Sequence, residues 1–466
     1  MSYSRISKQH IEYLESIVGR KQLYLSNDKL EKYGQDRTEN LLFIPEVVVL
    51  PDNVEQLSLV MRFCYEHNIP VTTRGGGTGL AGGALPVCGG LLLSMERFDK
   101  IIEIDEHNLQ VTTEAGVITE VLQIALQDKG LYFPPDPSSS GTSFIGGNIA
   151  TNAGGPRAVK YGVVKDYVLN LEVVLSTGDV IWTGANTLKN STGYNLTQLM
   201  VGSEGTLGII TKAVLKLIPY PTQSLLMLVP FYSLFKAAEA VSAVFKAGIT
   251  PSCLELMDRR AIDITLNYLQ DHSIQLDDKI QAHLILEVDG NHLEKLYHDC
   301  GKIQEILDQF ECGNILFADD TTSKEKLWKI RKNISRAVKL YSDVKKADTV
   351  VPRAELPKLL KGIHDICNLH GINFVSFGHA GDGNIHVSLL KENISDEFWN
   401  KEIDSVIFAI FTLVKSLGGT ISGEHGIGLV QKKYMEIVFS EIEINLMRSV
   451  KKTFDLKLIL NPQKIF

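Results

Sequence analysis

Apolar residues recur at helical spacing in several parts of the chain. In residues 54–68, four of them fall on one helix face, which predicts an amphipathic helix packed on a core. They are Leu57, Val60, Met61 and Cys64. The same spacing predicts helices over residues 8–34, 117–130, 324–341 and 397–417.

Other apolar runs are short and bounded by turn residues, which is typical of strands. Residues 167–184 predict a hairpin turning at Thr-Gly-Asp, and residues 374–390 predict another around Asp-Gly-Asn. From residue 225 onward strands alternate with helices, which favours an α+β domain with a small sheet. A linker is expected at residues 219–224.

The composition narrows the class of protein. The 466 residues allow two or three domains, and 44% hydrophobic with 22% charged residues is an ordinary globular balance. A net charge of −8 disfavours nucleic-acid binding. The six cysteines form no CxxC pair, which disfavours Fe–S clusters and a disulfide framework. The N-terminus lacks an apolar signal core, so a cytoplasmic protein is expected, with peripheral membrane docking left open.

Residues 73–83, TRGGGTGLAGG, form a glycine loop that formally matches G-x-G-x-x-G. A Rossmann fold needs a helix starting inside this loop, but Pro86 and two more glycines follow. A P-loop is excluded because no Gly-Lys-Ser/Thr follows. The remaining interpretation is a nest of backbone N–H groups around a diphosphate, with added charge from Arg74. The alternative is a glycine-rich turn without a function.

Two further stretches support a binding site. Residues 134–155, PPDPSSSGTSFIGGNIATNAGG, are long and structureless in this interpretation, which in a compact domain is usually functional. Residues 201–211, VGSEGTLGIIT, place Ser203, Glu204 and Gly208 beside a strand.

The stretch HAGDGNIH places His379 and His386 on the two arms of a turn. It is either a plain hairpin or half of a metal site. The turn lets the two imidazoles converge, and a divalent ion needs at least a third nitrogen or oxygen ligand. The best candidate is Glu424 in GEHG, with His425 next to it.

Three side chains are candidates for holding a carboxylate. Arg331 and Ser335 are one turn apart on one helix face, and Lys346 follows in KKAD. Arginine provides the bidentate fork that suits a carboxylate. On spacing alone, a solvated helix face is the alternative for Arg331.

The chain resembles the FAD-binding domain of the vanillyl-alcohol oxidase / p-cresol methylhydroxylase (PCMH) flavoproteins. The resemblance lies in PEVVVLPDNVEQLS, PVTTRGGGTGL, IGGNIATNAGG and VGSEGTLGIIT, and extends to NPQKI near the C-terminus. Within that superfamily it covers nearly the whole chain for the FAD-linked 2-hydroxyacid dehydrogenases. It implies an α+β fold with a PCMH-type FAD-binding domain (1–222). A substrate or cap domain (223–418) would carry an antiparallel sheet, flanking helices and the metal-site histidines, and a C-terminal segment (419–466) would pack back near the flavin.

The resemblance also implies which residues bind FAD. The glycine loop would wrap the diphosphate, the residues around Glu204 would hold the adenosine side, and Asn461 would lie near the isoalloxazine. The loop offers no histidine for attachment, so the FAD is expected to be non-covalent. Phe144 departs from the threonine common in the family. The implied FAD-binding residues are Arg74, Gly75, Gly76, Gly77, Thr78, Gly79, Gly83, Pro135, Asp136, Pro137, Ser138, Gly146, Gly147, Asn152, Glu204, Gly208, Ile210 and Asn461.

Metal-dependent members of this family bind zinc or a similar ion through a His-x6-His pair and the Glu of an EHG motif. These positions match His379, His386 and Glu424, which implies a divalent metal, Zn or Mn. His425 matches the catalytic base. In this chemistry the metal lowers the pKa of the substrate hydroxyl, the histidine accepts the proton and the flavin accepts the hydride.

The family binds the substrate carboxylate through residues that match Arg331, Ser335 and Lys346. At Ser388, relatives acting on hydroxyglutarate carry asparagine, so D-lactate or glycolate is favoured over a diacid. The expected partners are this 2-hydroxy acid and an external electron acceptor (a quinone, an Fe–S partner subunit or an electron-transfer flavoprotein), with a homodimer left open. The alternatives are a D-2-hydroxyglutarate dehydrogenase, a zinc hydrolase using the same histidines, and a nonenzymatic subunit of a larger oxidase.

Overall fold

Helix α3 (Val54–His67) forms where the apolar spacing predicts it. The Asn53 side chain caps its start by accepting a hydrogen bond from the Gln56 amide, and Asn68, in the left-handed conformation, ends it. The four residues predicted for its inner face are fully buried. The computed structural model describes residues 3–271 and 277–466 of the chain.

The chain divides into two units by its internal contacts. The first unit comprises Met1–Gly154, Val163–Tyr220 and Glu424–Phe466. The second unit comprises Gly155–Gly162 and Pro221–Gly423. The proline-containing linker predicted at 219–224 therefore spans the point where the chain enters the second unit.

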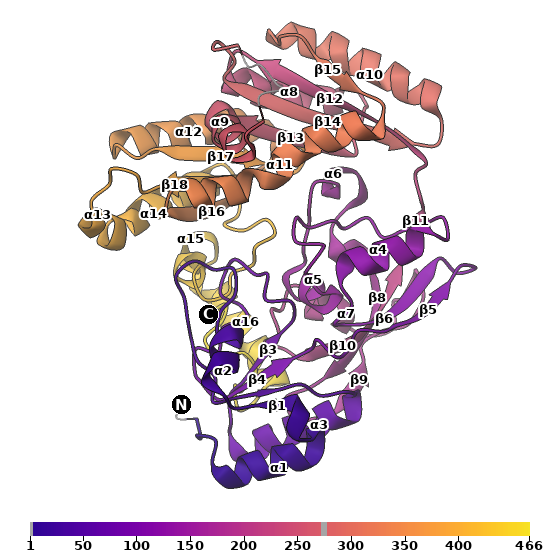
Figure 1. Ribbon diagram of the computed structural model, residues 1–466, viewed down its shortest axis with the longest axis vertical. Coiled ribbons are helices and arrows are strands. Elements are labelled where there is room, and N and C mark those ends of the chain that lie inside the picture. Colours follow the sequence, from indigo (N-terminus) through magenta and orange to yellow (C-terminus); the bar gives the residue numbers. More distant parts are fainter. Residues whose placement is uncertain (1–2, 272–276) are drawn as a thin grey trace. The chain divides into compact units, whose positions relative to one another are not determined.

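The first unit contains three sheets in the described part of the chain (Figure 1). In the first sheet β4 pairs in parallel with both β2 and β3, whereas all pairings of the second sheet are antiparallel. The pairing of β8 with β9 confirms the hairpin predicted at 167–184. The first sheet has the strand order β1 (Leu23–Tyr24), β2 (Val47–Val49), β4 (Leu91–Ser94), β3 (Val71–Arg74). The second sheet has the order β5 (Ile101–Asp105), β6 (Gln110–Glu114), β10 (Ile209–Lys216), β8 (Val168–Val174), β9 (Val180–Trp182). The third sheet pairs β11 (Ile218–Pro219) with β7 (Leu131–Tyr132).

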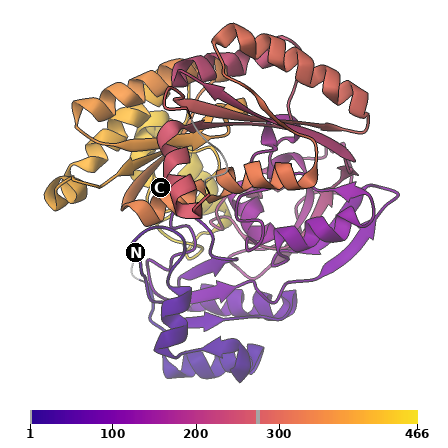
Figure 2. The same cartoon turned by 45° about the horizontal axis from the view of Figure 1, so that its top comes forward.

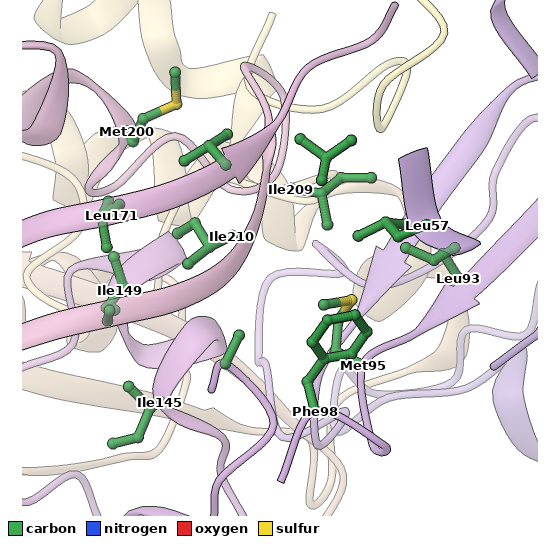
Figure 3. Close-up of a cluster of buried hydrophobic side chains, with 14 of the residues drawn as sticks. Leu57, Leu93, Met95, Phe98, Ile145, Ile149, Leu171, Met200, Ile209 and Ile210 are labelled. Carbon is green, nitrogen blue, oxygen red and sulfur yellow. The ribbon is translucent and has the colours of Figure 1, made fainter. Parts of the chain in front are cut away.

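A buried apolar core joins these sheets to the helices of the first unit. Figure 3 shows part of it, where Leu57 of α3 and Leu93 of β4 lie near Ile209. Each fully buried leucine or isoleucine contributes about 1.5–3 kcal/mol relative to exposure. The helices are α1 (Lys8–Val18), α2 (Asn27–Tyr33), α3, α4 (Thr119–Gln127), α5 (Ile145–Thr151), α7 (Leu196–Met200), α15 (Met435–Val438) and α16 (Glu441–Phe454).

Three expectations about elements are wrong. Residues 397–417 form two helices, α13 (Asp396–Lys401) and α14 (Ile403–Ser416), rather than one. Residues 8–34 are not one helix, because Gly19 ends α1 with φ +82°, and strand β1 precedes α2. Residues 134–155 are not structureless, because they contain α5. There Ile145 and Ile149 are buried, and a Cβ at Gly146 would lie only 2.7 Å from the Ala115 Cβ. Close packing thus stabilises a helix that its glycines disfavour.

The second unit is built on one larger antiparallel sheet, which confirms the α+β class and the antiparallel sheet of the predicted cap domain. The predicted hairpin at 374–390 is confirmed by the pairing of β17 with β18. In the described residues the strand order is β15 (Leu316–Ala318), β12 (Gln223–Phe231), β14 (Ala282–Gly290), β13 (Cys253–Asp258), β17 (Phe374–Gly378), β18 (Asn384–Leu390), β16 (Val344–Val350).

Helices cover both faces of this sheet (Figure 2). Helices α9 (Arg259–Leu269) and α11 (Thr321–Tyr341) share an apolar cluster with one face. Helices α8 (Leu234–Lys246) and α10 (Leu293–Leu307) pack on strands β12 and β14, and α14 (Ile403–Ser416) packs on β16. Helix α12 (Leu356–Leu369) packs on α8 and α14. The remaining helices are α6 (Ala158–Tyr161) and α13 (Asp396–Lys401).

Candidate active site

The turn between β17 and β18 carries the two predicted metal ligands of the second unit. After His379 the chain makes a short 3-10 turn, η5 (Ala380–Asp382), and reverses at Gly383 with φ +77°. A Cβ at Gly383 would lie 2.0 Å from the Val351 carbonyl oxygen, so only glycine fits. Glycine at this position therefore lets the chain reverse closely against the backbone that follows β16.

His379 and His386 are both buried and lie side by side. Their ring centroids are 5.3 Å apart with the rings nearly perpendicular. One ring nitrogen of His379 lies within 4.8 Å of a ring nitrogen of His386. Within the second unit, the structure thus brings together the two histidines that the sequence singled out.

His379 is bonded to a buried carboxylate on the neighbouring strand β13. Its Nδ1 lies 2.7 Å from Oε1 of Glu255. The other oxygen, Oε2, accepts hydrogen bonds from Nε and a terminal nitrogen of Arg331 on α11, at 2.7 and 2.6 Å. Burial disfavours the charged form of Glu255, but Arg331 and His379 outweigh it and lower its pKa to about 2. Glu255 is therefore ionised and orients both side chains.

His386 has an equivalent partner on strand β16. Its Nδ1 lies 3.1 Å from Oδ1 of Asp348, the residue directly opposite it in the sheet. That oxygen also accepts a hydrogen bond from the Asn384 side chain at 2.8 Å. The second oxygen, Oδ2, accepts from the Ser422 hydroxyl at 3.0 Å and the Gly423 amide at 2.7 Å. Asp348 thus connects the histidine to the chain that leads into GEHG.

These partners determine the histidine tautomers. Ionised Glu255 only accepts hydrogen bonds, so Nδ1 of His379 carries the hydrogen. Both oxygens of Asp348 accept hydrogen bonds from Asn384, Ser422 and Gly423, and this favours a hydrogen on Nδ1 of His386 in the same way. Nε2 is then the nitrogen with the lone pair. Metal-ligating histidines usually have this arrangement, with a carboxylate on the ring nitrogen that does not face the metal.

The residues predicted to hold the substrate carboxylate differ in their surroundings. Lys346 lies directly opposite Ser388, and alternation along the strands puts both on the sheet face of Asp348 and His386. Arg331 is buried and paired with Glu255, and its guanidinium stacks over Phe377 at 5.2 Å. Ser335, one turn further along α11, is exposed.

Glu424 and His425 begin the last segment of the first unit, directly after Gly423. Both are partly buried. Within the first unit, a Cβ at Gly154 would lie 3.1 Å from Oε2 of Glu424. Their roles as third ligand and base stay predictions.

The glycine loop of the first unit follows β3, and some of its positions accept only glycine. A Cβ at Gly76 would lie 2.2 Å from the Thr142 carbonyl oxygen, and Gly77 has φ +64°. Within the described part of the chain, the amides of residues 75–79 donate no hydrogen bond to a protein acceptor. Such a run of successive donors fits a diphosphate.

Buried polar atoms near this loop also fit a cofactor. Asn461 donates through its side-chain nitrogen to the carbonyls of Gly83 and Glu204, at 2.9 and 2.7 Å. Its Oδ1 and the Thr73 hydroxyl are buried and bonded to nothing in the described residues. Arg74, by contrast, donates to the carbonyls of Tyr33 and Gln35.

The remaining predicted FAD residues lie on two segments of the first unit. Asn152 ends α5 in the left-handed conformation, and its Oδ1 accepts from the Lys165 amide at 3.0 Å. Gly208 packs on the core, because a Cβ there would lie 2.4 Å from the Val173 side chain. In the segment before α5, Pro135 and Pro137 are buried, whereas Asp136 is partly buried and Ser138 is exposed.

Glu204 connects the loops of the first unit at 73–83, 201–211 and 424–428, which are called the loop cluster below. It is a buried non-glycine residue with φ +51°. Its Oε1 accepts from the Ile427 amide and its Oε2 from the Gly428 amide, both at 2.8 Å. Burial raises the pKa of Glu204 to about 7, although these amides and Lys464 act in the opposite direction.

Sequence reasoning missed Glu255 and Asp348. A weak signal was present, since Glu255 lies between two leucines in SCLELMD and Asp348 is the one acidic residue of KKADTVV. Their histidine partners are 124 and 38 residues away, so no local motif connects them.

The described helices include none long and apolar enough to cross a membrane. The six cysteines are free thiols.

Comparison with known families covers most of the chain. Residues 45–184 match the family described as FAD binding domain, and residues 220–465 match FAD linked oxidases, C-terminal domain. These matches include the glycine loop at 73–83, the histidine hairpin at 374–390 and the segment from Glu424 onward.

Two curated relatives are similar over nearly their whole length. The glycolate oxidase subunit GlcD of Bacillus subtilis is 38% identical, over 99% of this chain and 97% of that protein. The D-lactate dehydrogenase of Anaerostipes hadrus is 33% identical, over 99% of this chain and 98% of that protein.

A solved structure shares the fold. p-Cresol methylhydroxylase with substrate bound superposes with a TM-score of 0.79, over 98% of this chain and 96% of that chain, at 18% identity. The PCMH-type fold inferred from the glycine-rich segments is thereby confirmed.

Proposed function

This chain belongs to the FAD-linked oxidases, and from that membership we propose that it oxidises a D-2-hydroxy acid, D-lactate or glycolate, to the 2-oxo acid. The names of the two curated relatives support this substrate class. The observation that carries the proposal is the pair His379 and His386, each with Nδ1 on a buried carboxylate. A plain hairpin has no need of two such pairs.

FAD would be held without a covalent bond by the amides of residues 75–79, with Gly83 and Asn461 nearby. The loop contains no histidine to attach it. Bound FAD supplies the redox chemistry by accepting the hydride from C2 of the substrate.

His379 and His386 would hold a divalent metal, zinc or manganese, through Nε2, with Glu424 as the third ligand. Glu255 and Asp348 support this set because they hold the imidazoles in one tautomer and one orientation. The ion supplies Lewis-acid chemistry that lowers the pKa of the substrate hydroxyl.

His425 is the base in this proposal and accepts the hydroxyl proton. A histidine suits this role because its ordinary pKa lies near neutrality. Lys346 and Ser388 would bind the substrate carboxylate together with Arg331 and Ser335. The electrons would leave to an external acceptor, since the cysteines are scattered and cannot hold an Fe–S cluster within this chain.

Anaerobic reduction of the purified holoenzyme tests the proposal. D-lactate, L-lactate, glycolate and D-2-hydroxyglutarate are mixed with it separately, and flavin absorbance is followed with and without a chelator. We expect D-lactate or glycolate to bleach the flavin and the chelator to slow bleaching by on the order of 100-fold or more. If no hydroxy acid bleaches it, the function is wrong. As a second test, the metal is removed from the enzyme and zinc is added back. If adding the chelator to this zinc-loaded enzyme does not slow flavin bleaching, the metal is not required.

A further inference from the structure

Within the described residues, the buried carboxylate of Glu204 accepts its hydrogen bonds from backbone amides and from no side chain. Each of its oxygens accepts one of two successive amides, from Ile427 and Gly428, at 2.8 Å. Two successive N–H groups that converge on one anion form a nest. Here the anion in the nest is a side chain of the protein itself, contributed from more than 200 residues earlier in the chain.

The two glycines beside the nest have no room for a side chain. Gly426 has φ +79°, and a Cβ there would lie 3.0 Å from Cδ of Glu204. Gly428 has φ +49°, and a Cβ there would lie 2.2 Å from the Ala81 carbonyl oxygen. Two glycines give this segment wide backbone freedom, which the carboxylate removes.

Glu204 is itself held firmly in the loop cluster. Its amide donates to the Ala150 carbonyl at 2.8 Å, and its own carbonyl accepts from the Asn461 side chain. Its left-handed backbone is a conformation that a non-glycine residue keeps only when its surroundings enforce it. The side chain can therefore act as a fixed anchor.

We propose that Glu204 is a positioning residue for Glu424 and His425, which directly precede the anchored glycines in the chain. By fixing residues 426–428 it sets the direction in which His425 leaves the backbone. An error of about 1 Å in the placement of a base can cost on the order of 100-fold in rate. This inference rests on the proposed function for the identity of the reaction and for the roles of Glu424 and His425. It differs from a role as an adenosine contact, in which loss of the carboxylate would release FAD.

Glu204→Gln tests it, with Glu114→Gln as the matched control. Glu114 is an equally buried glutamate of the first unit that also accepts a backbone amide, from Lys100 at 2.9 Å. On FAD-loaded proteins, we expect Glu204→Gln to retain its flavin, to lower kcat by about 10–100-fold and to change KM by less than about 3-fold. Exchange of the Ile427 and Gly428 amide hydrogens should be at least about 10-fold faster. Glu114→Gln should leave all four quantities unchanged.

Two results would overturn the proposal: loss of FAD with normal turnover per remaining flavin, or unchanged kcat together with unchanged amide exchange. If Glu204→Gln does not fold, Glu204→Asp keeps the charge but withdraws it by one methylene, and an intermediate loss of kcat is expected. Failure of the proposed function would appear differently, as a wild-type flavin that no hydroxy acid reduces. In that case the exchange rates still decide whether Glu204 anchors the segment.

Discussion

The first unit has a buried glutamate among its glycine loops, and the second unit has one on strand β13. The two carboxylates accept hydrogen bonds from different kinds of donor. Glu204 is bound by two backbone amides that glycines leave accessible. Glu255 is bound by the charged side chain of Arg331 and by His379. The first unit uses the chain itself as the binding surface, and the second uses side chains projected from paired strands.

This difference has an electrostatic consequence. Burial disfavours ionisation of both carboxyls, yet the pKa of Glu204 is raised to about 7 and that of Glu255 is lowered to about 2. Amide dipoles compensate only part of the lost hydration, whereas a full positive charge more than compensates it. Backbone donors can therefore bind a ligand without a strong local charge, and the side-chain cluster holds charge permanently.

The largest expected effect is a loss of turnover without a loss of FAD when both histidines of the second unit are removed. Replacing His379 and His386 together by alanine should lower hydroxy-acid oxidation on the order of 1000-fold, because Lewis-acid assistance is worth several kcal/mol. FAD content should stay at the wild-type level, since the flavin donors are backbone groups of the first unit. Flavin absorbance, metal analysis and turnover measure this. His283→Ala, which removes another buried histidine of the second unit, is the control. Loss of FAD in the double variant would contradict the separation.

A smaller effect, on metal affinity, is expected from replacing Glu255, the carboxylate bonded to Nδ1 of His379. Glu255→Gln should weaken metal binding by about 10–100-fold, because the Nδ1 partner of His379 changes from an anion to an amide. Chelator competition gives the metal affinity, and FAD affinity should not change. Glu287→Gln, a buried glutamate on the adjacent strand β14, is the matched control and should bind metal normally. Equal weakening in both variants would show that general destabilisation is responsible.

The effect of replacing a glycine by alanine depends on the space around its position, as one glycine of each unit illustrates. Gly76→Ala should destabilise the protein by about 1–3 kcal/mol, because the new methyl group meets a backbone carbonyl that cannot rotate away. Gly301→Ala should stabilise it by about 0.5–1 kcal/mol, since Gly301 lies inside α10 with no atom within 4 Å of the added Cβ. Urea unfolding of both variants measures the contrast, and an equal sign for the two would refute it.

The smallest effect is on the pH dependence of stability. The raised pKa of Glu204 makes its contribution to stability fall as pH rises from about 4.5 to about 7. The lowered pKa of Glu255 gives a contribution present above about 4.5 and lost as pH falls toward about 2. Unfolding midpoints across pH should flatten between about 4.5 and 7 in Glu204→Gln, and below about 4.5 in Glu255→Gln. The opposite assignment of the two ranges would show that the local charges are misjudged.

Local patterns predicted much of the candidate site. Glycine runs indicate tight backbone, and the histidines flanking a glycine turn indicate arms that converge, because both features depend on neighbouring residues. Helix α5 was missed since its glycines disfavour a helix, and tertiary packing of Ile145, Gly146 and Ile149 stabilises it. Glu255 and Asp348 were missed since strand pairing, rather than spacing, brings them to the histidines.

By itself, the sequence determined the α+β class, the flavoprotein family and the residues with the right chemistry, because motifs and periodicity are local properties of the chain. Only the tertiary structure decided how those residues are held. It assigned a buried carboxylate to each histidine, engaged Arg331 with Glu255, and placed Glu204 in a nest of amides from residues 427 and 428. The physical reason is that a buried charge needs partners in three dimensions, and the partners come from whichever strands and loops the fold brings beside it.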